Sequence, residues 1–136
     1  MEGPFGQLDS IVSKRTDDTP LVLVGMGAGI APLLSLAAEY LTDRRIHLLW
    51  SVRRADDAYY SALLDEYERR SGGHLTVTTR VGRFHRDQLS TLLPEEEVTR
   101  GEFIVVGPNP AVLATQRMLR RIGVSRGRIH HERLTM

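Results

Sequence analysis

The sequence predicts an α/β fold in which a doubly wound, parallel five-stranded sheet carries helices on both faces. Five short segments with strand-like patterns alternate with segments of helical spacing along the 136 residues. Some of the strand-like segments are continuous apolar runs, which are typical of parallel strands buried on both faces. Because parallel strands are joined by right-handed crossovers, this alternation leaves few other arrangements. We expect the strand order 3-2-1-4-5.

The expected strands are segments that are continuously apolar or that alternate apolar with polar residues. They are residues 21–25 (LVLVG), 45–52 (RIHLLWSV), 74–81 (HLTVTTRV), 102–107 (EFIVVG) and 128–134 (RIHHERL).

Between the strands, apolar residues recur every three or four positions, which predicts helices. The first helix begins near Ile30 and has Pro32 in its first turn, where proline is well tolerated. Asp56 and Asp57 are expected to cap the second helix. The later helices are expected at 58–70, 85–93 and 110–123.

Length and composition fit one globular domain. Residues 1–19 are polar and rich in turn formers, so we interpret them as a lead-in to a domain at 20–136. No apolar run is long enough to span a bilayer, and we expect a cytoplasmic domain that makes no membrane contact itself. The formal net charge of +1 argues against a nucleic-acid partner, and a sequence without cysteine excludes disulfides and thiolate metal sites.

The histidines do not predict a metal site. His130 and His131 are adjacent on an expected strand, so their side chains point to opposite faces of the sheet. The remaining three are far apart in the sequence, at His47, His74 and His85. We therefore expect no bound metal.

A glycine-rich turn, GMGAGIAP at 25–32, follows the first strand. Neither the dinucleotide pattern G-x-G-x-x-G nor the P-loop ending in G-K-[ST] fits it. What remains is G-x-G-x-x-P over Gly27, Gly29 and Pro32, preceded by Gly25. Glycine lets backbone N–H groups approach a phosphate, and the positive end of the next helix points at the same place. A turn that serves packing alone is the alternative.

The end of the second strand helps to choose between two ligands. S-adenosylmethionine methyltransferases also have an apolar strand that leads into a G-x-G-x-G turn, but they use an acidic residue after the second strand to accept hydrogen bonds from a ribose. Here that strand ends in WSVRR, and arginine cannot accept a hydrogen bond. Ser51, Arg53 and Arg54 match a ribose 2′-phosphate instead. Solvated arginines without a ligand are the alternative.

Four segments in order resemble the nucleotide-binding half of the ferredoxin-NADP reductase superfamily, in particular its ferric reductase-like and oxygenase-reductase branch. They are LVLVGMGAGIAPLLSL, LLWSVRRADDAYYSALLDE, FIVVGPNP and RIHHERL. The segment EGPFG at 2–6 resembles the end of the flavin-binding barrel that precedes this domain in the family. The resemblance implies NADP or NAD as the cofactor of this domain and FAD in the intact protein only. It also implies two partners, a flavin-binding domain of the parent chain and a haem, iron or iron-sulfur electron acceptor.

The resemblance also implies roles for individual residues. Glu132 would be the carboxylate near the point where nicotinamide and flavin meet, which makes it the candidate catalytic residue. The implied cofactor-binding residues are Gly25, Gly27, Ala28, Gly29 and Pro32 at the pyrophosphate, Ser51, Arg53 and Arg54 at the adenosine, and Val106, Gly107, Pro108 and Asn109 at the nicotinamide.

Three positions depart from the family. Val106 stands where the family often has Cys, Ala28 where it often has Thr, and Leu134 where it often has an aromatic residue. Each departure removes a polar or stacking contact near the reacting ring.

We expect an NAD(P)H-dependent flavin oxidoreductase in the intact protein and a chain that by itself binds nucleotide without turnover. A non-catalytic nucleotide-binding or interaction domain of the same fold is the alternative.

Overall fold

The structure is a computed structural model that describes residues 19–134. Five strands form one sheet in the order β3-β2-β1-β4-β5, and every neighbouring pair is parallel. This confirms the predicted fold class and strand order. The strands are β1 (Leu21–Met26), β2 (Ile46–Val52), β3 (Leu75–Val81), β4 (Glu102–Pro108) and β5 (Ile129–Leu134).

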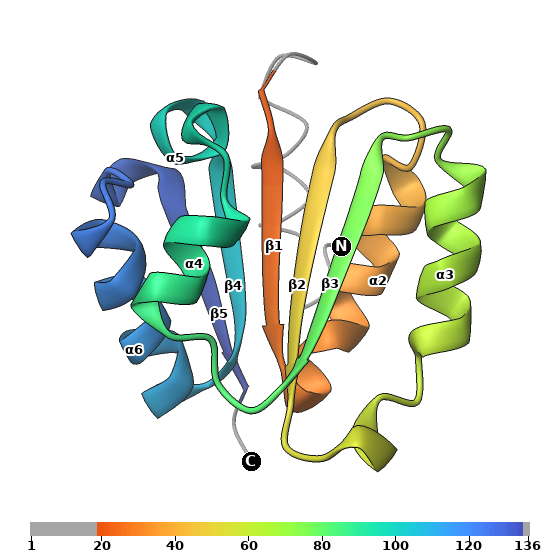
Figure 1. Cartoon of the computed structure of the whole chain (residues 1–136), viewed down its shortest axis with the longest axis horizontal. Coiled ribbons are helices and arrows are strands. Elements are labelled where there is room, and N and C mark those ends of the chain that lie inside the picture. Colours follow the sequence, from red (N-terminus) through yellow and green to blue (C-terminus); the bar gives the residue numbers. More distant parts are fainter. Residues whose placement is uncertain (1–18, 135–136) are drawn as a thin grey trace, which may run out of the picture.

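Helices cover both faces of this sheet, as Figure 1 shows. One face carries α2 (Ile30–Glu39) and α3 (Ser61–Arg70), and the other carries α4 (Arg86–Leu92), α5 (Glu95–Arg100) and α6 (Asn109–Arg121). Three short 3₁₀ turns complete the described chain, at η1 (Gly27–Gly29), η2 (Ala55–Asp57) and η3 (Arg126–Arg128). Within residues 19–134, no helix is long and apolar enough to cross a membrane.

The central strands are continuously apolar because helices bury both of their faces. In β1, Leu21 and Leu23 pack toward α2, whereas Val22 and Val24 pack toward α4 and α6. All four are at most 1% exposed. Alternate residues of a strand point to opposite faces, so a strand covered on both sides favours apolar side chains at successive positions.

The predicted start of α3 was wrong. Asp56 and Asp57 do not cap α3; they belong to η2, where the Asp57 carboxylate accepts a hydrogen bond from the backbone N–H of Arg54 at 3.2 Å. The helix begins only at Ser61. The intervening Tyr59 and Tyr60 pack against the buried ring of Trp50, with ring centroids 5.7 and 6.2 Å from it. This aromatic packing against β2 accounts for the later start of α3.

The sequence analysis also missed α5, for which no helix was predicted after Pro94. The helix follows Pro94 directly, has Glu95, Glu96 and Glu97 in its first turn and ends with Arg100. Acidic residues at the start and a basic residue at the end favour a helix through its dipole. At six residues, α5 is too short for an apolar stripe to reveal it.

Gly29 allows α2 to begin in contact with β4. A Cβ atom at this position would lie 2.2 Å from the carbonyl oxygen of Val106, well inside van der Waals contact. Gly25 is also packed, since its Cβ would lie 3.1 Å from Cδ1 of Leu33. At least one glycine of the motif therefore serves packing, whatever the turn binds.

We expect Gly29→Ala to lower the free energy of unfolding by about 2 to 3 kcal/mol, because the backbone of β4 cannot move aside as a flexible side chain could. Chemical denaturation monitored by circular dichroism measures this loss. Gly127→Ala is the matched control: nothing lies within 4 Å of its Cβ position, so a change below about 0.5 kcal/mol is expected. Equal stability of the two variants would contradict the packing role of Gly29.

Candidate functional site

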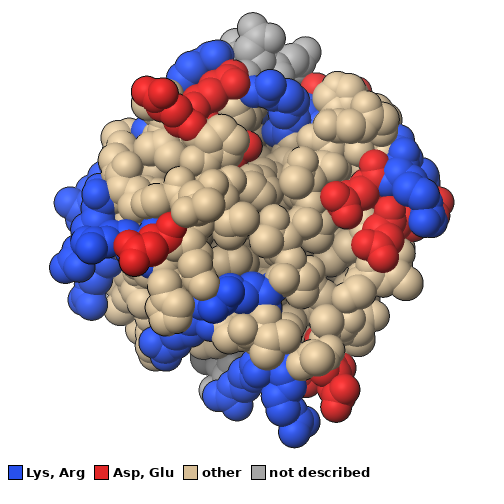
Figure 2. All heavy atoms as spheres, in the orientation of Figure 1, with Lys and Arg blue, Asp and Glu red and all other residues tan. Residues whose placement is uncertain are grey.

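A hollow of about 600 Å³ lies where β1, β2, β3 and β4 end. It is lined by residues at the ends of these strands or just beyond them, among them Gly27, Ser51, Arg53, Arg83 and Pro108. In parallel α/β sheets, ligands bind at the carboxyl ends of the strands where the strand order reverses. That reversal lies between the neighbouring strands β1 and β4. Figure 2 shows basic side chains at this lower edge of the molecule.

A second hollow, of about 580 Å³, lies between β3 and α4. It is lined by Thr78 and Arg80 of the outer strand β3 and by Asp87 of α4. We assign the functional site to the strand-end hollow instead, because it alone of these two joins the ends of four strands and the predicted glycine turn.

The glycine turn at the end of β1 is held by a buried tryptophan. Gly27 has a φ of +58°, in the left-handed region that favours glycine, and its missing Cβ faces open space. The indole Nε1–H of Trp50 donates a hydrogen bond to the carbonyl oxygen of Gly27 at 3.0 Å. Trp50 is fully buried on β2 and lies opposite Gly25 in the sheet register. The core of the sheet thus fixes one carbonyl of the turn.

Two helices begin at the hollow. The N-cap of α2 is Gly29, and the N-cap of α6 is Pro108; neither helix has a side-chain cap or an acidic residue in its first turn. The positive ends of both helix dipoles are therefore not neutralised by carboxylates of their own first turns. Such helix starts attract anions, and phosphate in particular.

The ends of β2 and β3 are tied together by two hydrogen bonds. The Ser51 hydroxyl donates to the carbonyl oxygen of Gly82 at 2.8 Å, and the backbone N–H of Gly82 donates to the carbonyl oxygen of Val52 at 2.7 Å. The next residue, Arg83, lines the hollow together with Arg53. The sequence analysis missed Arg83. Its only signal was a glycine followed by an arginine directly after the third strand.

The structure separates the two adjacent arginines at the end of β2. Arg53 lines the hollow, whereas Arg54 is not among the described residues that line it. The backbone of Arg54 is bound to Asp57, and Asp57 itself lines the hollow. The charged side chains lining this hollow are therefore two arginines and one carboxylate.

An aromatic side chain adds an apolar wall. Tyr59 lines the hollow with 61% of its surface exposed. Its ring meets the Trp50 ring edge to face, at an interplanar angle of 79°. Because Trp50 is buried, this contact gives the exposed ring a fixed support.

The other predicted site residues lie at varying distances from the hollow. Ala28 and Pro108 line it, and Asn109 is exposed as the first residue of α6. Gly107 is buried against Met26, and Val106 is fully buried in the core. Glu132 is partly buried and pairs in register with Val106. Predicted residues that do not line the hollow are Gly25, Gly29, Pro32, Arg54, Val106, Gly107, Asn109 and Glu132.

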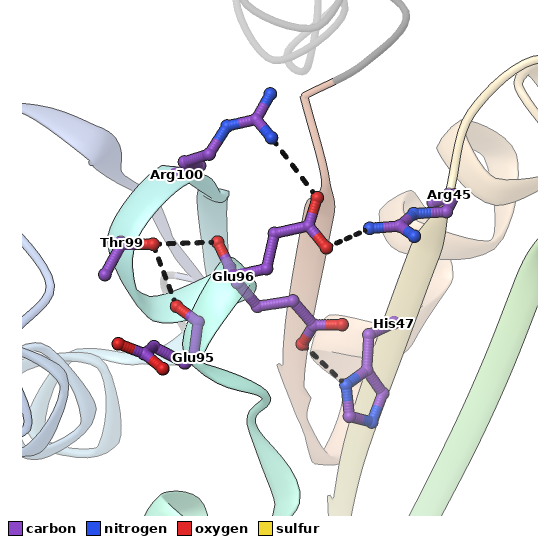
Figure 3. Close-up of polar contacts among 7 residues, drawn as sticks. Arg45, His47, Glu95, Glu96, Thr99 and Arg100 are labelled. Carbon is purple, nitrogen blue, oxygen red and sulfur yellow. Dashed lines mark hydrogen bonds and ion pairs between the residues drawn. The ribbon is translucent and has the colours of Figure 1, made fainter.

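The opposite, amino edge of the sheet holds a different set of charges, most of them shown in Figure 3. Glu96 of α5 pairs with Arg45 at 2.7 Å and with Arg100 at 3.3 Å. His47 Nδ1 lies 3.0 Å from a carboxylate oxygen of Glu97. The contacts of Glu96 with Arg45 and of Glu97 with His47 join α5 to the start of β2, which indicates a structural role.

Two histidines of the expected strands have carboxylate partners. Besides the contact of His47 with Glu97, His130 Nε2 contacts the buried carboxylate of Glu102 at the start of β4. In the part of the chain that the structure describes, no group of three or more His, Asp or Glu residues is arranged to hold a metal ion.

The chain is similar in sequence to oxidoreductases. A family model described as "Oxidoreductase NAD-binding domain" matches residues 23–113. The reductase component of propane 2-monooxygenase from Rhodococcus jostii (strain RHA1) is 25% identical over 150 residues, which cover 99% of this chain and 40% of that protein. The chain therefore spans less than half the length of this relative.

Two solved structures are also similar to this chain. A ferredoxin reductase in carbazole 1,9a-dioxygenase has a TM-score of 0.68 at 29% identity, over 89% of this chain and 36% of that chain. The flavohaem-like FAD/NAD-binding domain of nitric oxide dioxygenase from Vibrio cholerae has a TM-score of 0.75 at 19% identity, over 88% of this chain and 53% of that chain, and it supports the fold. With the family match over residues 23–113, these findings show that the chain belongs to the oxidoreductase NAD-binding domain family, within the ferredoxin-NADP reductase superfamily that its sequence resembles.

Proposed function

We propose that this chain binds NADPH in the strand-end hollow and presents its nicotinamide to a flavin held by another domain of the parent oxidoreductase. The proposal rests on one observation. The Gly27 turn, two helix starts and two arginines, Arg53 and Arg83, meet in one hollow. Each of these features favours phosphate, and a dinucleotide offers phosphate at more than one point.

The pyrophosphate is assigned to the Gly27 turn and the start of α2. The positive φ of Gly27 leaves open space where a side chain would stand, and Ala28 adds only a methyl group. A phosphate can therefore approach the backbone closely. The start of α6 at Pro108 adds a second helix dipole at the same hollow.

The 2′-phosphate is assigned to Arg53 and Arg83. Both line the same hollow, and the hydrogen bonds between Ser51, Gly82 and Val52 hold their two strand ends together. The Arg83 backbone is fixed further, because Arg80 Nε donates to its carbonyl oxygen at 2.9 Å. Two guanidinium groups outweigh the single carboxylate of Asp57, so the wall favours a phosphate over a ribose hydroxyl. The exposed ring of Tyr59 offers an apolar surface to the adenine.

The nicotinamide is assigned to the end of β4, near Pro108. When bound, NADPH supplies the hydride that reduces a flavin. The chain's own residues orient the nucleotide rather than exchange protons with it. Val106 is buried and carries no polar group, so no thiol at this position takes part. We propose that Glu132, which pairs with Val106 in the register of β4 and β5, provides a carboxylate near this end. The electron acceptor beyond the flavin is proposed to be a haem, iron or iron-sulfur centre.

Trp50→Phe should weaken NADPH binding several-fold, because the carbonyl of Gly27 loses its hydrogen bond and the turn loses its fixed position. It should also lower the free energy of unfolding by about 1 to 3 kcal/mol through the unpaired carbonyl and the lost volume. Calorimetric titration and chemical denaturation measure the two effects. The control is Phe103→Leu, another fully buried aromatic residue, on the face of the sheet away from Trp50. An equal loss of binding in this control would show that the effect reflects stability alone.

Wild type should bind NADPH roughly ten- to a hundred-fold more tightly than NADH, because charge-assisted hydrogen bonds to the 2′-phosphate contribute about 1.5 to 3 kcal/mol. Arg53→Ala should remove most of this preference and leave NADH binding nearly unchanged, and Arg83→Ala should remove part of it. Arg54→Ala is the control and should have little effect. Titrations with both nucleotides at one salt concentration test this, since phosphate contacts are screened by salt.

Two results would contradict the assignment. Equal binding of NADPH and NADH by wild type would rule out the proposed 2′-phosphate site. An Arg54→Ala variant that loses as much NADPH affinity as Arg53→Ala would also rule it out. Binding of neither nucleotide would instead favour a domain of the same fold that has lost its ligand.

The purified chain should be colourless and should not reduce dyes with NADPH. All strands in the part of the chain that the structure describes belong to the one parallel sheet, so none of them forms a flavin-binding barrel. Absorbance spectra and a dye-reduction assay measure this. Flavin that copurifies at one equivalent per chain would contradict it.

A further inference from the structure

A third hollow, which is lined by basic side chains, lies between α6 and β5 and outside the proposed nucleotide site. It has a volume of about 380 Å³ and is lined by Arg117 and Arg120 of α6, Arg126 of η3, and His131 of β5. It shares no lining residue with the strand-end hollow. Figure 2 shows basic side chains gathered along the left margin of the molecule, over α6.

The three arginines of this hollow lack partners. Arg117, Arg120 and Arg126 make no hydrogen bond or ion pair with any residue that the structure describes. Elsewhere on the surface, Arg45 and Arg100 pair with Glu96. Like charges that converge without a carboxylate repel one another, and a bound anion relieves this repulsion.

The segment of sequence around these arginines has no carboxylate that could neutralise their charges. Residues 109–131 include five of the 18 Lys and Arg residues of the chain and none of its 17 Asp and Glu residues. The only acidic residue of β5, Glu132, is next to His131 on the strand and so points to the opposite face of the sheet. The basic character therefore belongs to the whole α6–β5 connection and is not matched within it.

The hollow is also partly rigid. Arg128 holds the loop that carries Arg126, because its guanidinium donates to the carbonyl oxygens of Gly101 at 2.7 Å and Val98 at 2.6 Å. Across the hollow, the side chains of Gln116 and His131 are hydrogen-bonded at 2.9 Å. A fixed loop and a fixed polar pair mean that less side-chain freedom is lost when a ligand binds.

The chemistry of the lining defines the class of ligand. Arginine presents forked N–H donors that match the terminal oxygens of phosphate, and a phosphate monoester has three such oxygens and a charge near −2. Leu113 and Ile129 add apolar surface to the same hollow. We propose that the α6–β5 hollow is a second ligand site that binds a small organic phosphate monoester. The arginines hold its phosphate, and the apolar residues contact its organic part.

Nuclear magnetic resonance titration of the ¹⁵N-labelled chain with phenyl phosphate tests this, at constant ionic strength set with chloride. We expect saturable shifts at the side-chain amide of Gln116 and in residues 126–129, and weaker binding of inorganic phosphate. Arg117→Gln and Arg120→Gln should each weaken binding about tenfold, as expected for the loss of one charge-assisted contact.

Two controls separate this site from general charge and from the nucleotide site. Arg121→Gln changes an exposed arginine of the same helix that does not line the hollow, and it should leave binding unchanged. Arg53→Ala should also leave it unchanged, so the result does not depend on the proposed nucleotide function. The proposal is overturned if the shifts do not saturate, if they occur only at the Gly27 turn, if Arg121→Gln weakens binding as much as Arg120→Gln, or if inorganic phosphate binds as well as phenyl phosphate.

Discussion

The close contact between Gly29 and the backbone of β4 is the constraint on which the rest of the site depends. It sets the start of α2 directly against Val106, at a spacing that no side chain at position 29 would permit. The Gly27 turn is then confined between this contact and the hydrogen bond from Trp50. Both anchors come from the core of the sheet. The position of the turn is therefore decided by packing, and its exposed backbone is left open for a ligand.

The two edges of the sheet differ in how their charged side chains are paired. At the amino edge of the sheet, Glu96 pairs with Arg45 and Arg100, and a carboxylate oxygen of Glu97 contacts His47. At the carboxyl edge, Arg53 and Arg83 line a hollow together with the carboxylate of Asp57. Exposed ion pairs contribute little to stability, so the unmatched charges are the more informative ones about binding.

The departures from the family pattern now have a structural context. Val106 packs in the core, and its carbonyl oxygen is the atom that Gly29 approaches, so the residue has a clear role in packing. Ala28 lines the hollow, where a methyl group leaves the backbone accessible but adds no hydrogen bond. Neither residue places a polar side chain in the hollow that we propose as the nucleotide site.

The sequence by itself determined the fold class, the strand order and the position of the glycine turn, because continuous apolar strands and helical spacing are local patterns that a buried parallel sheet imposes. It also predicted Ser51 and Arg53 from where the second strand ends, and both line the strand-end hollow. Only the tertiary structure decided that Arg83 joins Arg53 while Arg54 does not, since this depends on hydrogen bonds between the ends of β2 and β3. Likewise, the packing of Tyr59 and Tyr60 on Trp50 delayed the start of α3, and contact across the sheet assigned Gly29 to packing. Each of these outcomes rests on contacts between separate elements of the fold, which no local pattern records.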